Sequence, residues 1–333
     1  MDVDAYVAAH RPAWERLGQL TRSSGRLSGP ELDELVDRYQ RAATQLSVVR
    51  TSSPDPQLVA ELTGLVARAR AAAGGRRSVG WRPVVGFLTR TFPAAAWRMR
   101  WWWLAAAAVT LGIGAAEAVW IINNPDIQAR LAPPEKVRQL VDADFAGYYR
   151  ENPKGSFAAQ VWTNNAFLAA QSLAFGFLLG LPTIYLMLNT ALGQLGPAAG
   201  YLIANGKGGE FFALILPHGM LELTAVFLAM GAGLRLGWTV IDPGGRSRVR
   251  ALAEEGRVTL GLALGLTLVL LVSGLIEGFI TPTYWNPWLK VAIGAAAEVA
   301  FLAYVVVLGR RATRAGLTGD VTEDLRGAVA PEV

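Results

Sequence analysis

The chain has 333 residues, of which 52% are hydrophobic and 17% are charged; soluble globular domains have about 25% charged residues, so the composition argues against a wholly soluble protein and favours one largely embedded in lipid. The absence of cysteine excludes disulfides, thiolate metal sites and cysteine nucleophiles. The net charge of +5 comes without a nucleic-acid recognition motif, so no nucleic-acid partner is expected.

Residues 1–80 are polar and predict a cytoplasmic region of three amphipathic helices. The first helix is expected over residues 3–23, the second after Ser28, and the third over 56–73. Ser28 followed by Glu31 has the spacing of a capping box at the start of the second helix. Three apolar stripes at helical spacing supply the expected core of this bundle: Val7, Trp14, Leu17 and Leu20; Leu32, Leu35, Val36, Tyr39, Ala43 and Leu46; Leu58, Leu62, Leu65, Val66 and Ala69.

The N-terminal twenty residues carry several charges and no apolar core, so no signal peptide is expected and this region should stay in the cytoplasm. Residues 81–100 alternate apolar side chains with arginines. Such a segment is typical of an interfacial amphipathic helix that lies on the membrane surface, with its arginines at the anionic head groups.

Residues 101–309 predict a transmembrane bundle, because one span needs about 20 predominantly apolar residues. The expected segments are residues 101–122, 157–179, 183–206, 211–236, 258–280 and 289–308. No charged residue lies between Lys154 and Lys207, so this stretch can cross twice, with a break at Gly180–Pro182 or at Gly193–Pro197. Residues 310–333 are expected to form a disordered cytoplasmic tail.

The arginines determine the expected topology. Basic segments lie before the first span, after Leu236 and after Leu308. All three lie on the cytoplasmic side only if the uncharged stretch crosses the membrane an even number of times. We therefore expect an all-α polytopic protein of the plasma membrane with about six membrane segments, one of them short or re-entrant, and with both termini cytoplasmic.

The segment from Pro217 to Gly237 carries His218 and Glu222 within an apolar span. A charged residue at the bilayer centre costs about 2.5–3.5 kcal/mol on insertion scales, which makes this pair a candidate functional site. The two residues are four apart and share one face of a helix. Four interpretations compete: a metal site completed by Glu117, Glu277 or Glu298, a proton or ion path, an intramembrane enzyme, and a polar contact that locks helices or a partner together.

The sequence favours the polar contact. Catalytic zinc needs about three protein ligands and often several histidines, and His10 is the one histidine besides His218. No nucleophile with a base partner and no convincing phosphate loop is visible. We expect no catalytic residue, no cofactor and no metal, and a pair bonded to Asn164, Asn165, Gln171 or Asn189 on neighbouring helices, or to a partner protein.

Glycines four residues apart recur in the apolar region, at Gly176 and Gly180, Gly233 and Gly237, and Gly261 and Gly265. Such faces let membrane helices approach closely. They are consistent with a compact bundle and equally with a homodimer.

Several motifs together resemble the stage II sporulation protein M family. They are Pro217-His218-Gly219 with Glu222, the run Gly233–Gly237, Thr163-Asn164-Asn165, Glu277–Pro282, and, as in longer actinobacterial members, Trp14, residues 27–32 and Tyr39. The resemblance implies an integral membrane protein that works with peptidoglycan hydrolases, or that is associated with RDD-type membrane proteins and MoxR-like ATPases. The N-terminal bundle departs from the short founding member, so a role at the forespore is not implied.

The expected function is therefore that of a non-enzymatic membrane scaffold in a multiprotein cell-envelope complex. A transporter or channel component that uses His218, Glu222 and Glu277 is the alternative, and an intramembrane enzyme is the third possibility. The candidate site residues are His218, Gly219, Glu222, Asn164, Asn165 and Glu277, with Glu117, Glu298 and Arg235 as secondary candidates.

Overall fold

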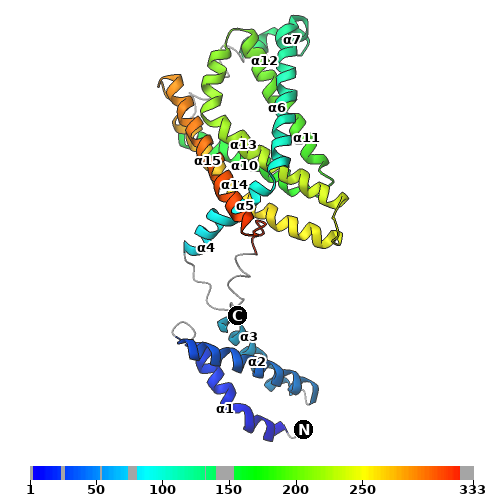
Figure 1. Cartoon of the computed structure of the whole chain (residues 1–333), viewed down its shortest axis with the longest axis vertical. Helices are drawn as coiled ribbons and strands as arrows, with labels where there is room; N and C mark the ends of the chain where they lie inside the picture. The colour runs from blue at the N-terminus through cyan, green and yellow to red at the C-terminus, as the bar shows by residue number, and fades with distance from the viewer. Residues whose placement is uncertain are drawn as a thin grey trace. The chain divides into compact units, whose positions relative to one another are not determined.

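The computed structural model describes residues 3–23, 27–52, 55–73, 81–131, 133–139 and 154–322. Every regular element in these ranges is a helix (Figure 1). The chain divides into two compact units, Met1–Arg82 and Pro83–Val333. The expected all-α class is confirmed for the described part of the chain.

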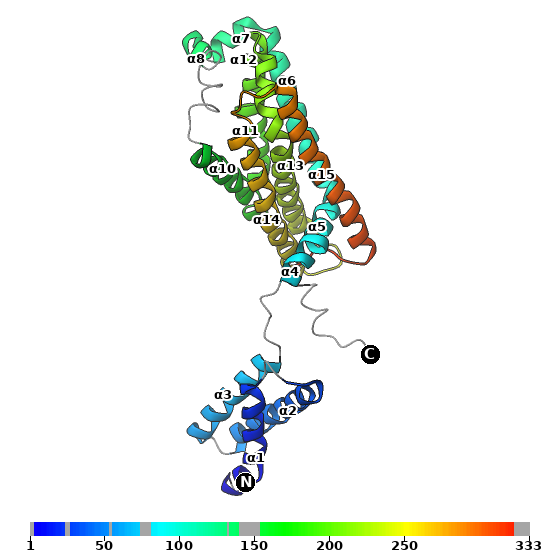
Figure 2. The ribbon, with the colours of Figure 1, turned by 90° about the vertical axis from the view of Figure 1, so that its left-hand side faces the viewer.

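The first unit contains α1 (Val3–Arg22), α2 (Gly29–Ser52) and α3 (Pro56–Ala73), each of which contacts the other two (Figure 2). Its core is formed by apolar side chains from all three helices: Trp14, Leu17, Leu20, Leu35, Ala42, Leu46, Val49, Leu58, Leu62, Leu65 and Ala69. The indole nitrogen of Trp14 donates a hydrogen bond to Gln45 Oε1 at 2.7 Å, which satisfies its polar atom inside the core.

The buried face of α2 differs from the predicted stripe. Leu32 and Val36 are exposed, whereas Ala42 and Val49 are buried. The stripe contained more apolar positions than two neighbouring helices can cover, so packing selected the face centred on Leu35 and Leu46. At the start of α2 the Glu31 carboxylate accepts hydrogen bonds from the Ser28 backbone N–H at 2.8 Å and from its hydroxyl at 2.7 Å. This is the returning half of the predicted capping box.

The remaining helices begin near the boundary of the second unit. They are α4 (Trp81–Gly86), the π-helical turn η1 (Phe87–Thr91), α5 (Phe92–Arg98), α6 (Arg100–Asn123), α7 (Pro125–Leu131), α8 (Pro134–Gln139), α10 (Lys154–Ala174), α11 (Leu181–Thr190), the π-helical turn η3 (Ala191–Leu195), α12 (Gly196–Ala204), α13 (Gly208–Ile241), α14 (Arg248–Phe279) and α15 (Pro287–Arg314). Ser247 caps α14 and Asn286 caps α15, where Pro287 occupies the first turn.

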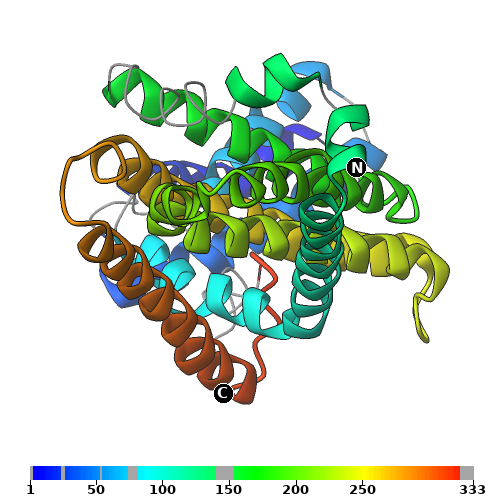
Figure 3. The same cartoon turned by 90° about the horizontal axis from the view of Figure 1, so that it is seen from above.

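Helix α13 is the central element of the second unit. It contacts α6, α10, α14 and α15, which surround it when the molecule is viewed from above (Figure 3). Its apolar residues are buried on nearly all sides from Ala225 to Gly233. A helix that is apolar all round belongs inside a bundle, and this position brings its polar residues against three neighbouring helices.

Within the described residues, four helices are long and apolar enough to cross a membrane, namely α6, α13, α14 and α15. Large apolar side chains point outward on them, as on α14, where the exposed leucines 260, 264, 268, 271 and 275 recur every three or four residues. Soluble monomers rarely expose a continuous apolar face of this kind, so the second unit is a membrane unit. The stretches α10 and α11 to α12 are not among the four, and a double crossing there stays a prediction.

The uncharged stretch is broken once, at residues 175–180, where Gly180 adopts a φ of 72°. This left-handed conformation favours glycine. At the other predicted break, residues 193–197, the helix continues through η3 into α12. The basic segment after Leu236 is also more helical than expected, because α13 runs on to Ile241 and α14 starts at Arg248, which leaves a short loop.

Glycines bring the turn that follows α10 into backbone contact with α13. A Cβ added at Gly176 would lie 2.5 Å from the Gly233 carbonyl oxygen, and one added at Gly237 would lie 2.6 Å from the Leu179 carbonyl carbon. Real Cβ atoms do not approach backbone so closely, so the turn over residues 175–180 and α13 both need glycine there. Two of the predicted small-residue faces therefore pack against each other within one chain.

The segment over residues 81–100, which was expected to lie on the membrane surface, is helical and partly buried. Trp81, Val84 and Val85 are exposed, but Phe92, Ala94, Ala95, Ala96 and Met99 are buried in the core of the second unit. Helix α5 contacts α14 and α15. The aromatic and alanine surface of α5 is apolar enough to pack against these helices, and its place relative to the membrane stays a prediction.

The predicted disordered tail is wrong for residues 310–322. Residues 310–314 continue α15, and Asp320 is buried, where it accepts a hydrogen bond from Arg257 Nε at 2.8 Å. Gly319, with a φ of 84°, lies against Ala95. Residues 140–153 and 323–333 fall outside the described residues.

Candidate functional site

The polar motif lies on the buried face of α13. Helix α13 continues through Pro217, and His218 and Glu222 follow on one face. A Cβ on Gly294 of α15 would collide with the Pro217 backbone, so α15 packs directly behind the motif. Close packing on that side leaves the side chains of His218 and Glu222 to point toward α10 and α14.

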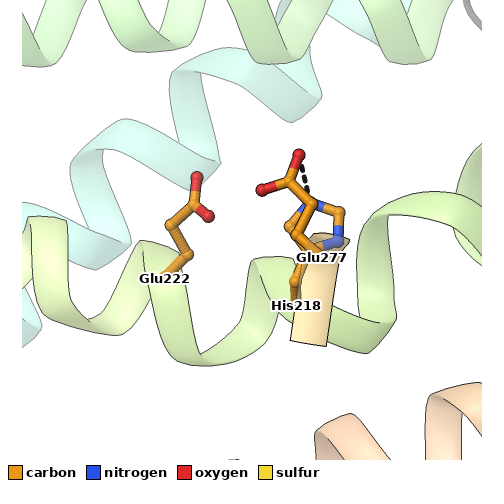
Figure 4. A group of neighbouring side chains, drawn as sticks. All are labelled: His218, Glu222 and Glu277. Atoms are coloured by element: carbon orange, nitrogen blue, oxygen red, sulfur yellow. Dashed lines mark ion pairs between the residues drawn. The ribbon is translucent and has the colours of Figure 1, made fainter. Parts of the chain in front are cut away.

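Glu277 on α14 completes a cluster of three ionisable side chains with His218 and Glu222 (Figure 4). The Nε2 atom of His218 lies 3.8 Å from Oε1 of Glu277. One potential ligand atom from each of the three residues lies within 4.8 Å of the other two. The fold thus joins a pair from one helix to a carboxylate that is distant in sequence.

Neutral polar groups orient the cluster. Asn165 Nδ2 on α10 donates to Glu222 Oε1 at 2.7 Å, and the Ser273 hydroxyl on α14 lies 3.3 Å from Glu222 Oε2 and 3.0 Å from the His218 carbonyl oxygen. The Nδ1 atom of His218 lies 3.2 Å from the Thr281 hydroxyl. These contacts connect three separate parts of the membrane unit, as the sequence predicted for Asn165.

A cavity of about 520 Å³ adjoins the cluster. His218, Gly219, Glu222 and Glu277 form part of its wall. The other polar residues that line it are Asn164, Asn165, Gln171, Thr190 and Gln194. The volume is enough for several waters, so the polar side chains face a space that can be hydrated.

The described residues that line the cavity include acidic side chains but no lysine or arginine. The acidic residues are Glu222 and Glu277. Lys290, which is buried nearby, donates to the carbonyl oxygens of Thr281 and Thr283 at 3.0 and 3.2 Å. Buried carboxylates require a proton or a cation partner, so the cluster is suited to holding positive charge.

The secondary candidates lie elsewhere. Glu117 on α6 lies against Gly196, and Glu298 on α15 accepts a hydrogen bond from Thr224 at 2.8 Å. Arg235 lies on α13 roughly 25 Å from His218, given the 1.5 Å rise per residue. It pairs with Glu255 through two contacts of 3.0 Å each. These residues lie in other parts of the unit and are not brought to the cluster.

Sequence reasoning did not name Ser273, Thr190 or Gln194 as site residues, and it included Thr281 only within the family motif Glu277–Pro282. Ser273 lies four residues before Glu277, so helical spacing could have placed it on the same face. Thr281 lies in a turn after α14, and only the return of that turn over α13 brings its hydroxyl to His218. Asn189, which was predicted as a partner, is not among the residues that line the cavity.

Comparison with known protein families gives two matches. The model described as "Stage II sporulation protein M" matches residues 106–282, and the model described as "Domain of unknown function (DUF8413)" matches residues 4–75. The first match covers more than half of the chain and includes the entire polar cluster. The second falls within the first compact unit. No curated protein and no solved structure matches the chain.

Proposed function

Because the chain belongs to the stage II sporulation protein M family, we propose that it is a non-enzymatic membrane scaffold of a multiprotein cell-envelope complex. The first unit, which has its own core, would receive a soluble regulator in the cytoplasm. The membrane unit would hold membrane partners. By family resemblance these include RDD-type membrane proteins, MoxR-like ATPases or peptidoglycan hydrolases.

The observation that carries this proposal is the use of the polar motif in contacts between helices. Glu222 is bonded to Asn165 on α10 and Ser273 on α14, and His218 is bonded to Thr281. Hydrogen bonds of this kind hold membrane helices together where apolar contacts provide little driving force. They support a role for the motif in setting the arrangement of α10, α13 and α14.

The proposed topology has six membrane segments in the plasma membrane and both termini in the cytoplasm. The chain lacks cysteine, so a single introduced cysteine can be labelled without background reaction at native cysteines. Ser247→Cys, in the loop between α13 and α14, should react with a membrane-impermeant maleimide only after the cells are opened. Thr283→Cys, between α14 and α15, should react in intact cells. The opposite pattern would contradict this topology.

The scaffold role is tested by crosslinking in native membranes. The full chain and a variant without residues 1–80 are expressed at equal levels, crosslinked and purified, and the captured proteins are quantified. We expect soluble partners to be lost from the truncated variant while membrane partners remain. Equal capture of every partner by both proteins, or capture no greater than for an unrelated membrane protein, would refute the proposal.

The cavity supports a second candidate, a transporter or channel component. Its wall contains His218, Glu222 and Glu277 beside several amides, and buried ionisable groups mark many ion and proton paths. The purified chain in liposomes would then show a proton or cation flux that Glu222→Gln abolishes. Such a flux would favour this candidate over the scaffold, and its absence with a correctly folded protein would leave the scaffold favoured.

A further inference from the structure

Beyond the scaffold role, we propose that His218, Glu222 and Glu277 form a binding site for one divalent transition-metal ion. The sequence led to the expectation of no metal, because His218 had no neighbouring second histidine. The tertiary structure supplies a third ligand, Glu277 of α14, which was one of the glutamates that the sequence offered.

The donor set fits such an ion. One imidazole nitrogen and one oxygen from each of two carboxylates lie within 4.8 Å of one another. Zinc-type ions bind histidine at about 2.0–2.1 Å and carboxylate oxygen at about 2.0–2.2 Å, so the ligand atoms of a tetrahedral site are roughly 3.3 Å apart. The His218–Glu277 separation is 3.8 Å, and rotation about the broad terminal carboxylate torsions can close this difference.

The neighbouring hydrogen bonds prepare His218 for coordination. The Thr281 hydroxyl lies 3.4 Å from the Ile276 carbonyl oxygen, to which it donates. Its oxygen lies 3.2 Å from Nδ1 of His218 and can accept from it when Nδ1 carries the proton. In that tautomer Nε2, which lies 3.8 Å from Glu277 Oε1, would be the metal ligand. Histidine ligands of metals are commonly oriented in this way by an acceptor on the other ring nitrogen.

The two carboxylates are prepared as well. Glu222 accepts from Asn165 and lies within hydrogen-bonding distance of Ser273, as carboxylate ligands usually do in metal sites. Glu277 is 3% exposed, and its Oε2 atom has no hydrogen-bond partner among the described residues. It lines the cavity, where no described lysine or arginine is present to balance it. A divalent ion would balance both carboxylates.

The cavity also provides the remaining coordination positions. Three protein ligands leave at least one position for water, and the adjoining space of about 520 Å³ can hold it. The imidazole favours a transition metal over magnesium or calcium, which prefer all-oxygen sites. The ion would link α13 to α14 and reinforce the contacts described above.

The test uses the full chain purified in detergent with a tag that contains no histidine. The protein is stripped with a chelator, dialysed against Co²⁺, Zn²⁺ or Mn²⁺ in turn, and freed of unbound ion before elemental analysis. We expect about one ion per chain for at least one metal, and visible d–d bands from protein-bound Co²⁺. Metal should also raise the apparent melting temperature.

The variants His218→Ala and Glu277→Gln should lower affinity for that ion at least tenfold and lose the thermal shift. Glu298→Gln is the matched control, because Glu298 is also a glutamate in a membrane helix with one unpartnered oxygen, but it lies outside the cluster. His10→Ala controls for the other histidine. Both controls should bind normally.

Size-exclusion profiles of the stripped proteins establish that each variant is folded before loading. Failure of all three metals to bind the wild type above the level of the His218→Ala/Glu277→Gln double variant would overturn the proposal. Equal loss of binding in Glu298→Gln would overturn it too. Neither outcome would affect the scaffold role, which depends on partner capture and not on bound metal.

Discussion

Replacing Glu255 should destabilise the membrane unit more than replacing its neighbour Glu254. The Glu255 side chain is 1% exposed and pairs with Arg235 on α13 and Arg98 on α5, whose side chains are each 24% exposed. It therefore connects three helices. Removing one partner of a buried ion pair costs about 3–5 kcal/mol, because the remaining charge loses its compensation.

The partial exposure of the two arginines reduces this cost, so we expect about 3 kcal/mol for Glu255→Ala. For a unit of this size, one kcal/mol corresponds to about 2–4 °C in melting temperature. The expected decrease is therefore about 6–12 °C. It is measured by heating the full-length protein in detergent and quantifying the folded fraction by size-exclusion chromatography.

Glu254→Ala is the matched control. Glu254 lies one residue away and pairs with Arg246 at 2.6 Å and Arg250 at 2.9 Å, but its side chain is 30% exposed. Exposed pairs contribute about 0–1 kcal/mol, so its melting temperature should fall by no more than about 4 °C. Arg235→Ala combined with Glu255→Ala should cost less than the two single changes added together, because both act on one pair. Equal effects of Glu254→Ala and Glu255→Ala would refute the reasoning.

Three further predictions concern packing and the first unit. Gly233→Leu should prevent correct folding, because even a Cβ at this position would overlap a backbone carbonyl of α10. Gly112→Leu should be tolerated, because no atom lies within 4 Å of the position that its Cβ would take. The yield of monodisperse protein measures both effects. Leu17→Ala should lower the unfolding free energy of residues 1–82 by about 2–5 kcal/mol, because Leu17 is fully buried. Leu32→Ala should lower it far less, because Leu32 is exposed. Urea unfolding followed by circular dichroism compares the two variants. Hydrogen bonds from two arginines lower the pKa of Glu34 to about 2. A carboxylate with a lowered pKa stabilises the folded state above its unfolded pKa and loses this effect as pH falls toward its folded pKa. The stability difference between the wild type and Glu34→Gln should thus be present at pH 6 and shrink between about pH 5 and 2; a difference that persists unchanged at pH 2 would contradict the assignment.

Local patterns in the sequence were sufficient for the class of the protein and for much of its segmentation. Apolar length predicted the membrane unit, and the spacing of leucines predicted the three helices of the first unit. The i, i+4 spacing placed His218 and Glu222 on one helical face. These features depend on the periodicity of a single helix, which neighbouring residues determine by themselves.

Contacts between distant helices could not be read in this way. Periodicity gives the apolar face of a helix but not the neighbour that covers it, so the burial of Phe92 and Met99 was missed. As a further metal ligand, Glu117, Glu277 and Glu298 were alternatives in the sequence. Only packing decided that Glu277 reaches His218: α14 packs against α13 and α10 and brings Glu277 to the motif, while Glu117 and Glu298 make separate contacts.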